Sequence, residues 1–391
     1  MKKRLACATV SNTCPTMMRS DLQALVDTPP ALLGHAGDAG VILGTLGSLE
    51  LNLEGFPFPG WSDAAARAAV ARRLQESLHK LPQRQWVFCA EVAELTLEER
   101  QMLVERGQLT PSMAARQDGV HVLLNKQQDT ECYINDEEHL HLQTFYPGQH
   151  NAPQALSEMR EMRTLLEKEL PVALDSLFGN LSFDPSKSGA GLFLSFMAYL
   201  PGLRLCKHMP QVQHALDEMG IYISPLFPFQ KKEASDLWLI HAPASPFKQE
   251  ENTLKDVNKA LEALTTQELQ ARARLLDTPK STAKLQGAVA EACRCLSSSA
   301  RLRYSRLLEA LSLVRLGLYY GWLRAGKGVA AEQLAHRLSR AYLDTAPLYM
   351  NLRGGYNTQL KRAKERAAYA SQLMQDVLRI TPTEKFTIHH E

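Results

Sequence analysis

An acidic corner between two apolar stretches is the feature that most restricts how this chain can fold. Cys132 to Gln143 reads C-Y-I-N-D-E-E-H-L-H-L-Q, with alternating apolar residues on both sides of Asp136 to Glu138. The alternation is typical of strands, whereas three consecutive carboxylates disfavour a strand and favour a turn. The stretch therefore predicts two strands joined by a tight acidic turn. The turn is either solvated or a place where a positive group is held.

Composition restricts the class of protein. With 391 residues, 45% hydrophobic and 22% charged, the chain is typical of a globular protein with two or three domains. The net charge of +2 does not indicate nucleic acid, and we expect no direct nucleic-acid or membrane partner. No apolar run is long enough to span a bilayer, and the apolar stretch after Met1 to Arg4 ends at Val10, too early for a signal peptide. Seven scattered cysteines do not match a disulfide framework or zinc spacing, so we expect a reduced, cytoplasmic protein without a metal site.

The pattern of the chain changes near residue 245. Residues 1–40 are weakly patterned, and the next two hundred residues mix strand and helix patterns. From residue 246 apolar residues recur at three- and four-residue spacing, which is typical of helices. We therefore predict an α+β domain over 1–245 and a helical domain over 246–391. The expected strands are 41–43, 86–90 and 237–240. A capping box at Thr96 predicts the start of one helix. The other expected helices are 63–81, 155–178 (interrupted at Pro171), 211–220, 254–276, 285–311 and 313–323.

The acidic corner resembles the N-E-E-D-H-L-R motif of the ATP:guanido phosphotransferases, the family of creatine and arginine kinases. Further resemblances follow in order: L-x-G-F-P-F at 53–58, a frame similar to L-T-x-C-P-T-N-x-G-T-G at 181–191, and L-P-G-L at 200–203. The sequences at 99–105 and 315–321 are similar to motifs of the bacterial branch of the family, the protein-arginine kinases. The resemblance covers Val41 to Tyr369. It implies a guanido-kinase-like antiparallel sheet flanked by helices, followed by an all-helical domain for dimerisation and regulation.

The reactive positions implied by the resemblance are mostly changed. The guanidinium-binding carboxylate corresponds to Glu137. The arginines that bind the nucleotide correspond to Leu46, Ser48, His141 and Phe193. Phosphoryl transfer depends on cations around the phosphate oxygens. We therefore expect that the chain does not transfer phosphate by the family mechanism, unless residues such as Arg204, Lys207 or Lys231 replace the missing arginines.

Other candidate sites have a structural alternative. Glu137 either binds a guanidinium group or forms an ordinary salt bridge at an exposed corner. Lys187, with the backbone amides at Gly189 and Gly191, either contacts phosphate or belongs to a simple turn. His139 and His141 could form half of a metal site, but no third ligand lies nearby in the sequence, so a structural pair is favoured.

The predicted helical domain is rich in basic residues. Thirteen Lys or Arg residues and four acids lie between residues 301 and 370, which indicates a cationic surface. Arg362 and Arg366 lie in R-A-K-E-R-A, which resembles the R-D-x-x-R-A stretch of the phosphoarginine pocket in the protein-arginine kinases. Two arginines suit bidentate phosphate recognition. The alternative is a solvated basic helix.

The leading hypothesis is a pseudokinase that acts as a regulatory or phosphoarginine-binding subunit in protein quality control or stress response. The resemblance implies a homodimer whose partners are a zinc-finger activator, Clp protease or stress-repressor components, and phosphoarginine proteins. No cofactor is certain. The alternative is an active ATP-dependent protein-arginine kinase, which would use Mg-ATP. A structural dimer subunit without a phosphorylated ligand is a third hypothesis.

Overall fold

The computed structural model describes residues 21–22, 25, 40–81, 84–148, 151–226, 236–243, 250–326, 358–375 and 377–379. Most of the weakly patterned residues 1–40 therefore lie outside the described residues. The same holds for Lys231 and for the basic residues between 327 and 357. Among the described residues, no helix combines the length and apolar character needed to cross a bilayer.

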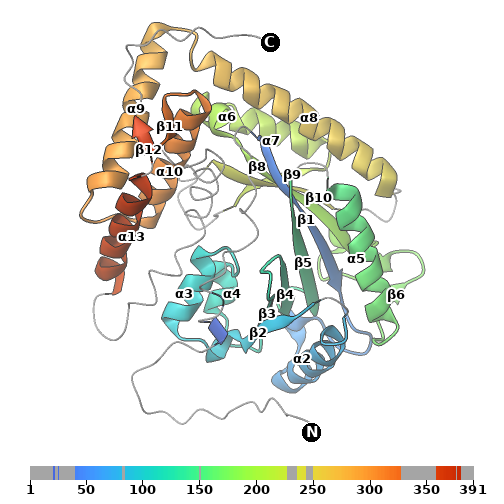
Figure 1. The fold of residues 1–391 in the computed structure, drawn as a ribbon. Helices are drawn as coiled ribbons and strands as arrows, with labels where there is room; N and C mark the ends of the chain where they lie inside the picture. Colours follow the sequence, from blue (N-terminus) through green and yellow to red (C-terminus); the bar gives the residue numbers. More distant parts are fainter. Residues whose placement is uncertain are drawn as a thin grey trace.

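An antiparallel sheet of eight strands forms the centre of the molecule (Figure 1), in the order β2-β3-β4-β5-β1-β8-β10-β9. Each strand pairs with its neighbours in antiparallel register. The predicted antiparallel sheet is thus confirmed. The strands are β1 (Ile42–Leu51), β2 (Trp86–Glu91), β3 (His121–Asn125), β4 (Thr130–Ile134), β5 (Leu140–Pro147), β8 (Leu192–Tyr199), β9 (Tyr222–Pro225) and β10 (Leu237–Pro243).

The helices begin at residues that suit helix N-termini. Asp63 accepts from the backbone N–H of Ala66, and Thr96 and Glu99 form the predicted capping box. The helices of the first 243 residues are α2 (Ala64–Leu78), α3 (Leu97–Glu105), α4 (Pro111–Ala115), α5 (Ala152–Glu167), α6 (Pro201–Leu205) and α7 (Met209–Glu218), with short 3-10 turns η2 (Pro59–Trp61), η3 (Val92–Glu94) and η4 (Pro185–Lys187). Later come α8 (Glu250–Arg274), α9 (Pro279–Ser298), α10 (Tyr304–Tyr319) and α13 (Thr358–Met374).

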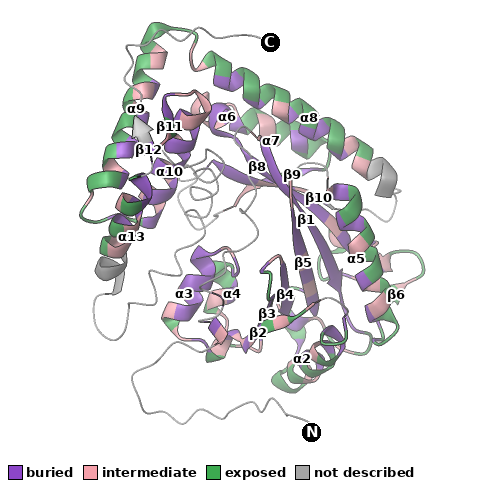
Figure 2. Ribbon diagram, in the orientation of Figure 1, coloured by how far each residue is buried: buried purple, intermediate pink, exposed green. Residues whose placement is uncertain are grey.

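Two apolar clusters cover the two faces of the central strands. On one face α2, α5 and α8 pack against the sheet, and a side chain at Gly47 would meet α5 at Ala155. On the other face Leu46 and Phe145 join α9, α10 and α13 in a second cluster. The strands are accordingly buried, while the outer sides of α8, α9 and α2 are exposed (Figure 2). Because α8 packs with the first cluster, the predicted division at residue 245 stays a prediction.

Three details of the sequence-based prediction were wrong. The helix expected over 155–178 ends at Glu167, and a hairpin of β6 (Leu174–Asp175) and β7 (Gly179–Asn180) follows Pro171. The helix expected over 285–311 is interrupted between α9 and α10. The helical domain also contains a small ribbon of β11 (Leu323–Ala325) and β12 (Val377–Arg379). Strands of two or three residues are too short to produce a sequence pattern.

A buried ion pair joins α8 to the sheet domain. Arg272 Nε donates to Glu268 Oε1 at 2.6 Å, and both side chains are buried. The Glu268 carboxylate also accepts from the backbone N–H groups of Gly202 and Leu203, each at 2.9 Å, at the N-terminus of α6. Arg272 donates further to the Tyr199 carbonyl oxygen at 3.1 Å. The ion pair therefore connects α8 with α6 through Glu268 and with the end of β8 through Arg272.

We predict that Glu268→Ala lowers the free energy of unfolding by about 3–5 kcal/mol, because it leaves the buried Arg272 charge without its carboxylate. Denaturant unfolding measures the change. Glu262→Ala, on an exposed part of the same helix, should change stability by less than about 0.5 kcal/mol. A loss below about 1 kcal/mol in Glu268→Ala would contradict the role assigned to the pair.

Candidate functional site

The acidic corner is a tight turn between β4 and β5, as predicted. Asn135 adopts a left-handed backbone with φ of 61°, and its N–H donates to the His139 carbonyl oxygen at 3.1 Å. Its side-chain amide donates to the Arg67 carbonyl oxygen at 2.9 Å. Asparagine tolerates this conformation better than most residues. The turn is therefore fixed at its base, and its three carboxylates point in different directions.

Glu138 and His139 point into the protein. The Glu138 carboxylate accepts from Asn52 Nδ2, from Ser182 Oγ and from the backbone N–H of Phe183. His139 Nδ1 accepts from the backbone N–H of Leu53 at 2.9 Å, so the proton lies on Nε2, which donates to a backbone oxygen. Both side chains are buried. They therefore hold neighbouring segments in place and do not face a ligand.

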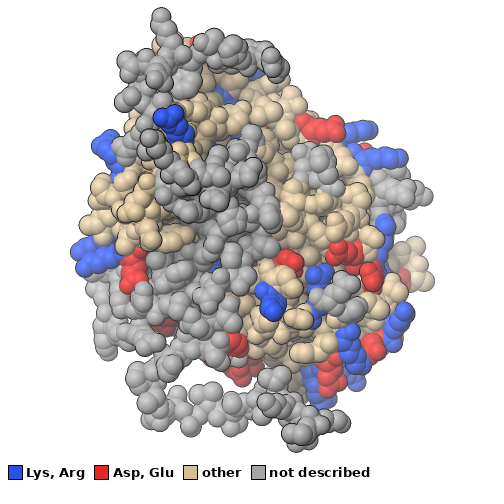
Figure 3. All heavy atoms as spheres, viewed as in Figure 1, with Lys and Arg blue, Asp and Glu red and all other residues tan. Residues whose placement is uncertain are grey.

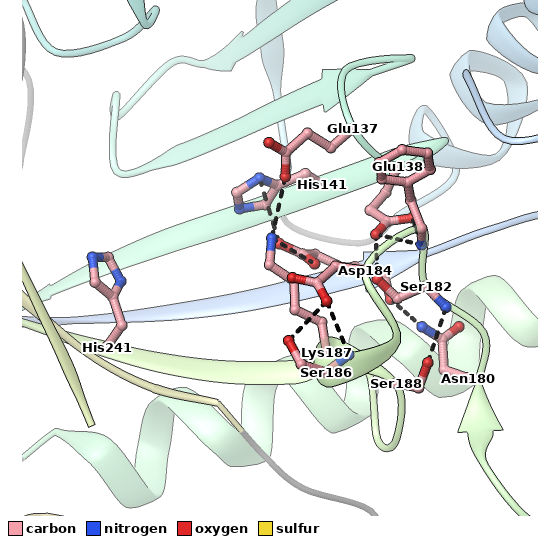
Figure 4. A network of polar contacts seen from close by, with 12 residues as sticks. Glu137, Glu138, His141, Asn180, Ser182, Asp184, Ser186, Lys187, Ser188 and His241 are labelled. Atoms are coloured by element: carbon pink, nitrogen blue, oxygen red, sulfur yellow. Dashed lines mark hydrogen bonds and ion pairs between the residues drawn. The ribbon is translucent and has the colours of Figure 1, made fainter. Parts of the chain in front are cut away.

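Asp136 is partly buried and Glu137 is exposed, and each lies beside a cation of the same chain. Asp136 is 3.7 Å from Arg116, which also binds Asp118 through two nitrogens. Glu137 Oε2 is 3.2 Å from Lys187 Nζ, although 69% of the Glu137 side chain is exposed. Figure 4 shows Glu137 and Lys187 extended toward each other. The positive group beside the retained carboxylate is thus supplied by the chain itself.

The four positions that correspond to nucleotide arginines lie on one face of three adjacent strands. Ser48 of β1 pairs directly with Phe193 of β8, and Leu46 lies two residues earlier on β1. His141 of β5 pairs with Glu50 of β1. The structure therefore brings the predicted positions together. None of them carries a positive charge: burial lowers the pKa of His141 to about 4, against a weaker opposite effect of Asp136.

Glu50 adds a carboxylate in the middle of this surface. Burial raises its pKa to about 7, Lys187 acts in the opposite direction, and Glu138 and Glu137 add to the increase. Its Oε2 has no hydrogen-bond partner in the part of the chain that the structure describes, and it lies 4.0 Å from Lys187 Nζ. Glu50 is a site residue that was not predicted from the sequence. The spacing of Leu46, Ser48 and Glu50 could have indicated it, because residues two apart on a strand share a face.

Lys187 is held between these carboxylates. Burial lowers its pKa, but attraction by Glu50 and Glu137 outweighs that effect and keeps the pKa above its usual value. A lysine in this position stays charged. Its charge is balanced locally by Glu50 and Glu137, so it is not free to bind an anion without leaving them.

The glycines of the loop 181–191 serve close backbone contacts. A side chain at Gly191, where φ is +66°, would meet the Glu50 carbonyl oxygen at 2.6 Å. The Gly189 N–H donates to the Asn180 carbonyl oxygen at 3.1 Å. The Gly189 amide is therefore already used by a backbone hydrogen bond, and Gly191 allows a close backbone approach, which supports the structural alternative for this stretch.

The two histidines of the corner have separate surroundings. His139 is engaged with backbone groups, and His141 lies 5.7 Å from the Tyr133 ring in an edge-to-face contact. Within the described ranges, no three metal-binding side chains come together. A third histidine, His241 of β10, is hydrogen-bonded through both ring nitrogens. Its partners are the hydroxyl groups of Ser195 on β8, at 2.9 Å, and of Ser224 on β9, at 3.0 Å.

The predicted phosphoarginine arginines lie on α13. The side chain of Arg362 is outside the described part of the chain. Arg366 is buried, donates to Glu105 Oε1 of α3 at 2.6 Å and lies over the Tyr304 ring. Figure 3 shows one face of the molecule, on which the described Lys and Arg side chains are interspersed with Asp and Glu. The role of both arginines stays a prediction, and Arg366 has an internal partner.

The comparisons with known proteins agree with this geometry. The sequence profile described as ATP:guanido phosphotransferase, C-terminal catalytic domain, matches residues 69–271. The chain belongs to the ATP:guanido phosphotransferase family. The protein-arginine kinase of Halothermothrix orenii is 26% identical over 74% of this chain and 81% of its own length. That of Moorella thermoacetica is 27% identical over 87% and 96%. The predicted resemblance is confirmed.

Solved structures share the fold. The duplicated taurocyamine kinase of Schistosoma mansoni with bound transition-state analogue components has a TM-score of 0.53 and 18% identity, over 68% of this chain and 38% of that chain. Its substrate-free form has a TM-score of 0.51 and 17% identity, over 75% and 41%. At this identity the likeness supports the guanido-kinase fold alone.

We predict a pH-dependent gain of stability in Glu50→Gln. The folded-state pKa of about 7 exceeds the unfolded value of 4.5. The folded protein therefore binds more protons in that window, and its stability falls as the pH rises through it. Relative to wild type, Glu50→Gln should gain up to about 3 kcal/mol between pH 4.5 and 7 and stay constant above.

Denaturant unfolding at a series of pH values measures this difference. Glu54→Gln, an exposed carboxylate beyond the end of β1, controls for a general effect of removing a negative charge. A stability difference between Glu50→Gln and wild type that does not depend on pH would contradict the assignment.

Proposed function

We propose that this chain is a degenerate member of the protein-arginine kinase branch that acts as a regulatory or phosphoarginine-binding subunit and does not transfer phosphate. The observation that carries the proposal is the charge of the sheet surface around Ser48. The four arginine positions are empty of charge, and a buried carboxylate, Glu50, lies among them. A polyphosphate would find no cation at these four positions, and the Glu50 carboxylate would repel it wherever it is ionised.

The pairing of Lys187 with Glu137 supports the same proposal. A substrate guanidinium would have to displace a cation that is already within 3.2 Å of the carboxylate. Such competition weakens substrate binding even if a nucleotide were present. The proposed partners are those implied by the resemblance: a zinc-finger activator, components of the Clp protease or of a stress repressor, and a second copy of the chain.

An active ATP-dependent protein-arginine kinase is the second candidate function. Lys187 favours it, because this lysine is charged, only half-buried and placed at the edge of the sheet surface. For this function Lys187 would have to leave Glu137 and contact the phosphates of Mg-ATP. Glu137 would then be free to bind the substrate guanidinium.

We predict that Mg-ATP and Mg-ADP do not raise the thermal unfolding temperature of the purified protein. A nucleotide at about 100 times its dissociation constant would stabilise the folded state by about 2.7 kcal/mol, which is readily measured. Transfer of labelled phosphate to an arginine-rich protein is measured in parallel. A clear shift that disappears in Lys187→Met, together with phosphate transfer, would favour the active kinase.

The phosphoarginine-binding part of the proposal depends on the pair of Arg366 and Glu105. In the structure Arg366 is paired with the Glu105 carboxylate. A phosphate would therefore compete with Glu105 for this arginine. We predict that Glu105→Gln binds free phosphoarginine several-fold more tightly than wild type, because Arg366 is released. We predict that Arg362→Ala binds it more weakly. Calorimetric titration measures both, and identical affinities in all three proteins would exclude this site.

A further inference from the structure

Lys187 lies between two carboxylates that differ in their exposure to water. Its Nζ is 3.2 Å from Glu137 Oε2 and 4.0 Å from Glu50 Oε2. The side chain of Glu137 is 69% exposed, whereas that of Glu50 is 11% exposed. The lysine is therefore paired with the exposed carboxylate and lies just beyond hydrogen-bond distance of the buried one.

The backbone that carries Lys187 is held by hydrogen bonds of its own turn. The Lys187 N–H donates to the Asp184 carbonyl oxygen at 2.9 Å, and the Asp184 side chain accepts from the backbone N–H of Ser186 at 3.0 Å. A lysine side chain is a flexible four-carbon stem with a terminal charge. A movement of Nζ by about 1 Å would bring it to the distance of a charge-assisted hydrogen bond with Glu50. A change of partner therefore requires rotation of the side chain alone.

Glu50 lacks a hydrogen bond that an ionised carboxylate would need. Its Oε2 is buried and has no hydrogen-bond partner among the described residues, and its Oε1 is 4.0 Å from His141 Nδ1. A neutral carboxyl group tolerates such burial much better than a charged one does. Because burial raises the pKa of Glu50 to about 7, the need for a partner arises close to neutral pH.

The other charged groups around Glu50 include one cation. The groups that act on its pKa are Lys187, which lowers it, and Glu138, Glu137 and Asp184, which raise it. Hydrogen bonds from Ser186 hold the pKa of Asp184 below its usual value, so Asp184 is already ionised near neutral pH. Among these groups Lys187 is the one that can neutralise an ionised Glu50.

The two histidines on this side of the sheet do not compete with Lys187. Burial lowers the pKa of His141 to about 4, and it also lowers the pKa of His241, to which Lys187 adds. Both rings are therefore largely uncharged at pH 7. Neither supplies a positive charge to Glu50 or to Glu137 there.

The two possible ion pairs of Lys187 differ in strength. An ion pair with an exposed carboxylate is weak, because water screens the attraction. The same charges attract each other several times more strongly where the surroundings are less polar. Once Glu50 is ionised, its attraction for Lys187 therefore exceeds that of Glu137.

We propose that Lys187 is a pH-dependent switch, which pairs with Glu137 while Glu50 is protonated and moves to Glu50 when Glu50 ionises. In the second state Glu137 has lost the cation that occupies it in the structure. An external cation then meets an open carboxylate at the acidic corner. The switch goes beyond the proposed function and does not depend on whether the chain binds a nucleotide.

The test is carbon-13 NMR of the full chain with glutamate labelled at Cδ, titrated over about two pH units on either side of 7. The signals are assigned with Glu50→Gln and Glu137→Gln. We expect the Glu50 signal to titrate near pH 7 and the Glu137 signal to shift at the same midpoint, because Lys187 leaves it. This shift of Glu137 should be absent in Glu50→Gln and in Lys187→Met. The signal of Glu54, an exposed carboxylate beyond the end of β1, should not follow the Glu50 midpoint.

The midpoint of Glu50 gives a second measurement on the same samples. Lys187→Met should raise it by about 1 pH unit, because the neighbouring cation is removed. Glu137→Gln should lower it, because Lys187 loses its other partner. Glu137 is exposed, so this variant tests the switch even if Lys187→Met does not fold.

Three results would overturn the proposal. The Glu50 signal could show no titration near neutral pH. The Glu137 signal could stay constant while Glu50 titrates. The shift of Glu137 could persist in Lys187→Met, which would show a direct effect of the Glu50 charge without movement of the lysine. All measurements are made without nucleotide, so their outcome and that of the Mg-ATP experiment are separate.

Discussion

The region around the site depends on one buried carboxylate that is held by neutral donors. Glu138 accepts hydrogen bonds from the side chains of Asn52 and Ser182 and from the backbone of Phe183. These groups come from the end of β1 and from the loop after β7, which are about 130 residues apart in the chain. A buried carboxylate is costly unless its oxygens are paired, so this arrangement fixes both segments at once.

The sheet face around Ser48 has uncharged side chains at the positions that correspond to nucleotide arginines, and it contains the buried carboxylate of Glu50. A face that binds polyphosphate requires cations whose charge the ligand neutralises. Here Glu50 is buried beside the four uncharged positions, its pKa is raised by burial, and the nearby Lys187 opposes that increase. A nucleotide would add negative charge beside Glu50 and would compete with it for Lys187. Burial of Glu50 costs stability as its carboxyl group ionises, but Lys187 lies close enough to offset part of its charge.

The predictable features were those set by local chemistry. Neighbouring residues alone predict the turn at 135–139, the strands on either side of it and the capping box at Thr96. The order of the elements was predicted from the family motifs. The face shared by Leu46, Ser48 and Glu50 also follows from strand periodicity. The hairpin at 174–180 did not, because it depends on the approach of Gly179 to Gly189. The Lys187–Glu137 pair joins residues that are 50 positions apart and required the tertiary structure.

The contrast between preserved frame and altered chemistry has a physical reason. Asn52, Glu138, His139 and Gly191 make buried hydrogen bonds or close backbone contacts, so replacing any of them would leave unpaired groups or steric overlap. Leu46, in contrast, contributes apolar area to the cluster shared with α9, α10 and α13. A charged side chain at that position would be buried between the sheet and these helices. Its charge would be unpaired unless an anion neutralised it. An apolar side chain at position 46 is therefore compatible with the packing of α9, α10 and α13 on this face of the sheet.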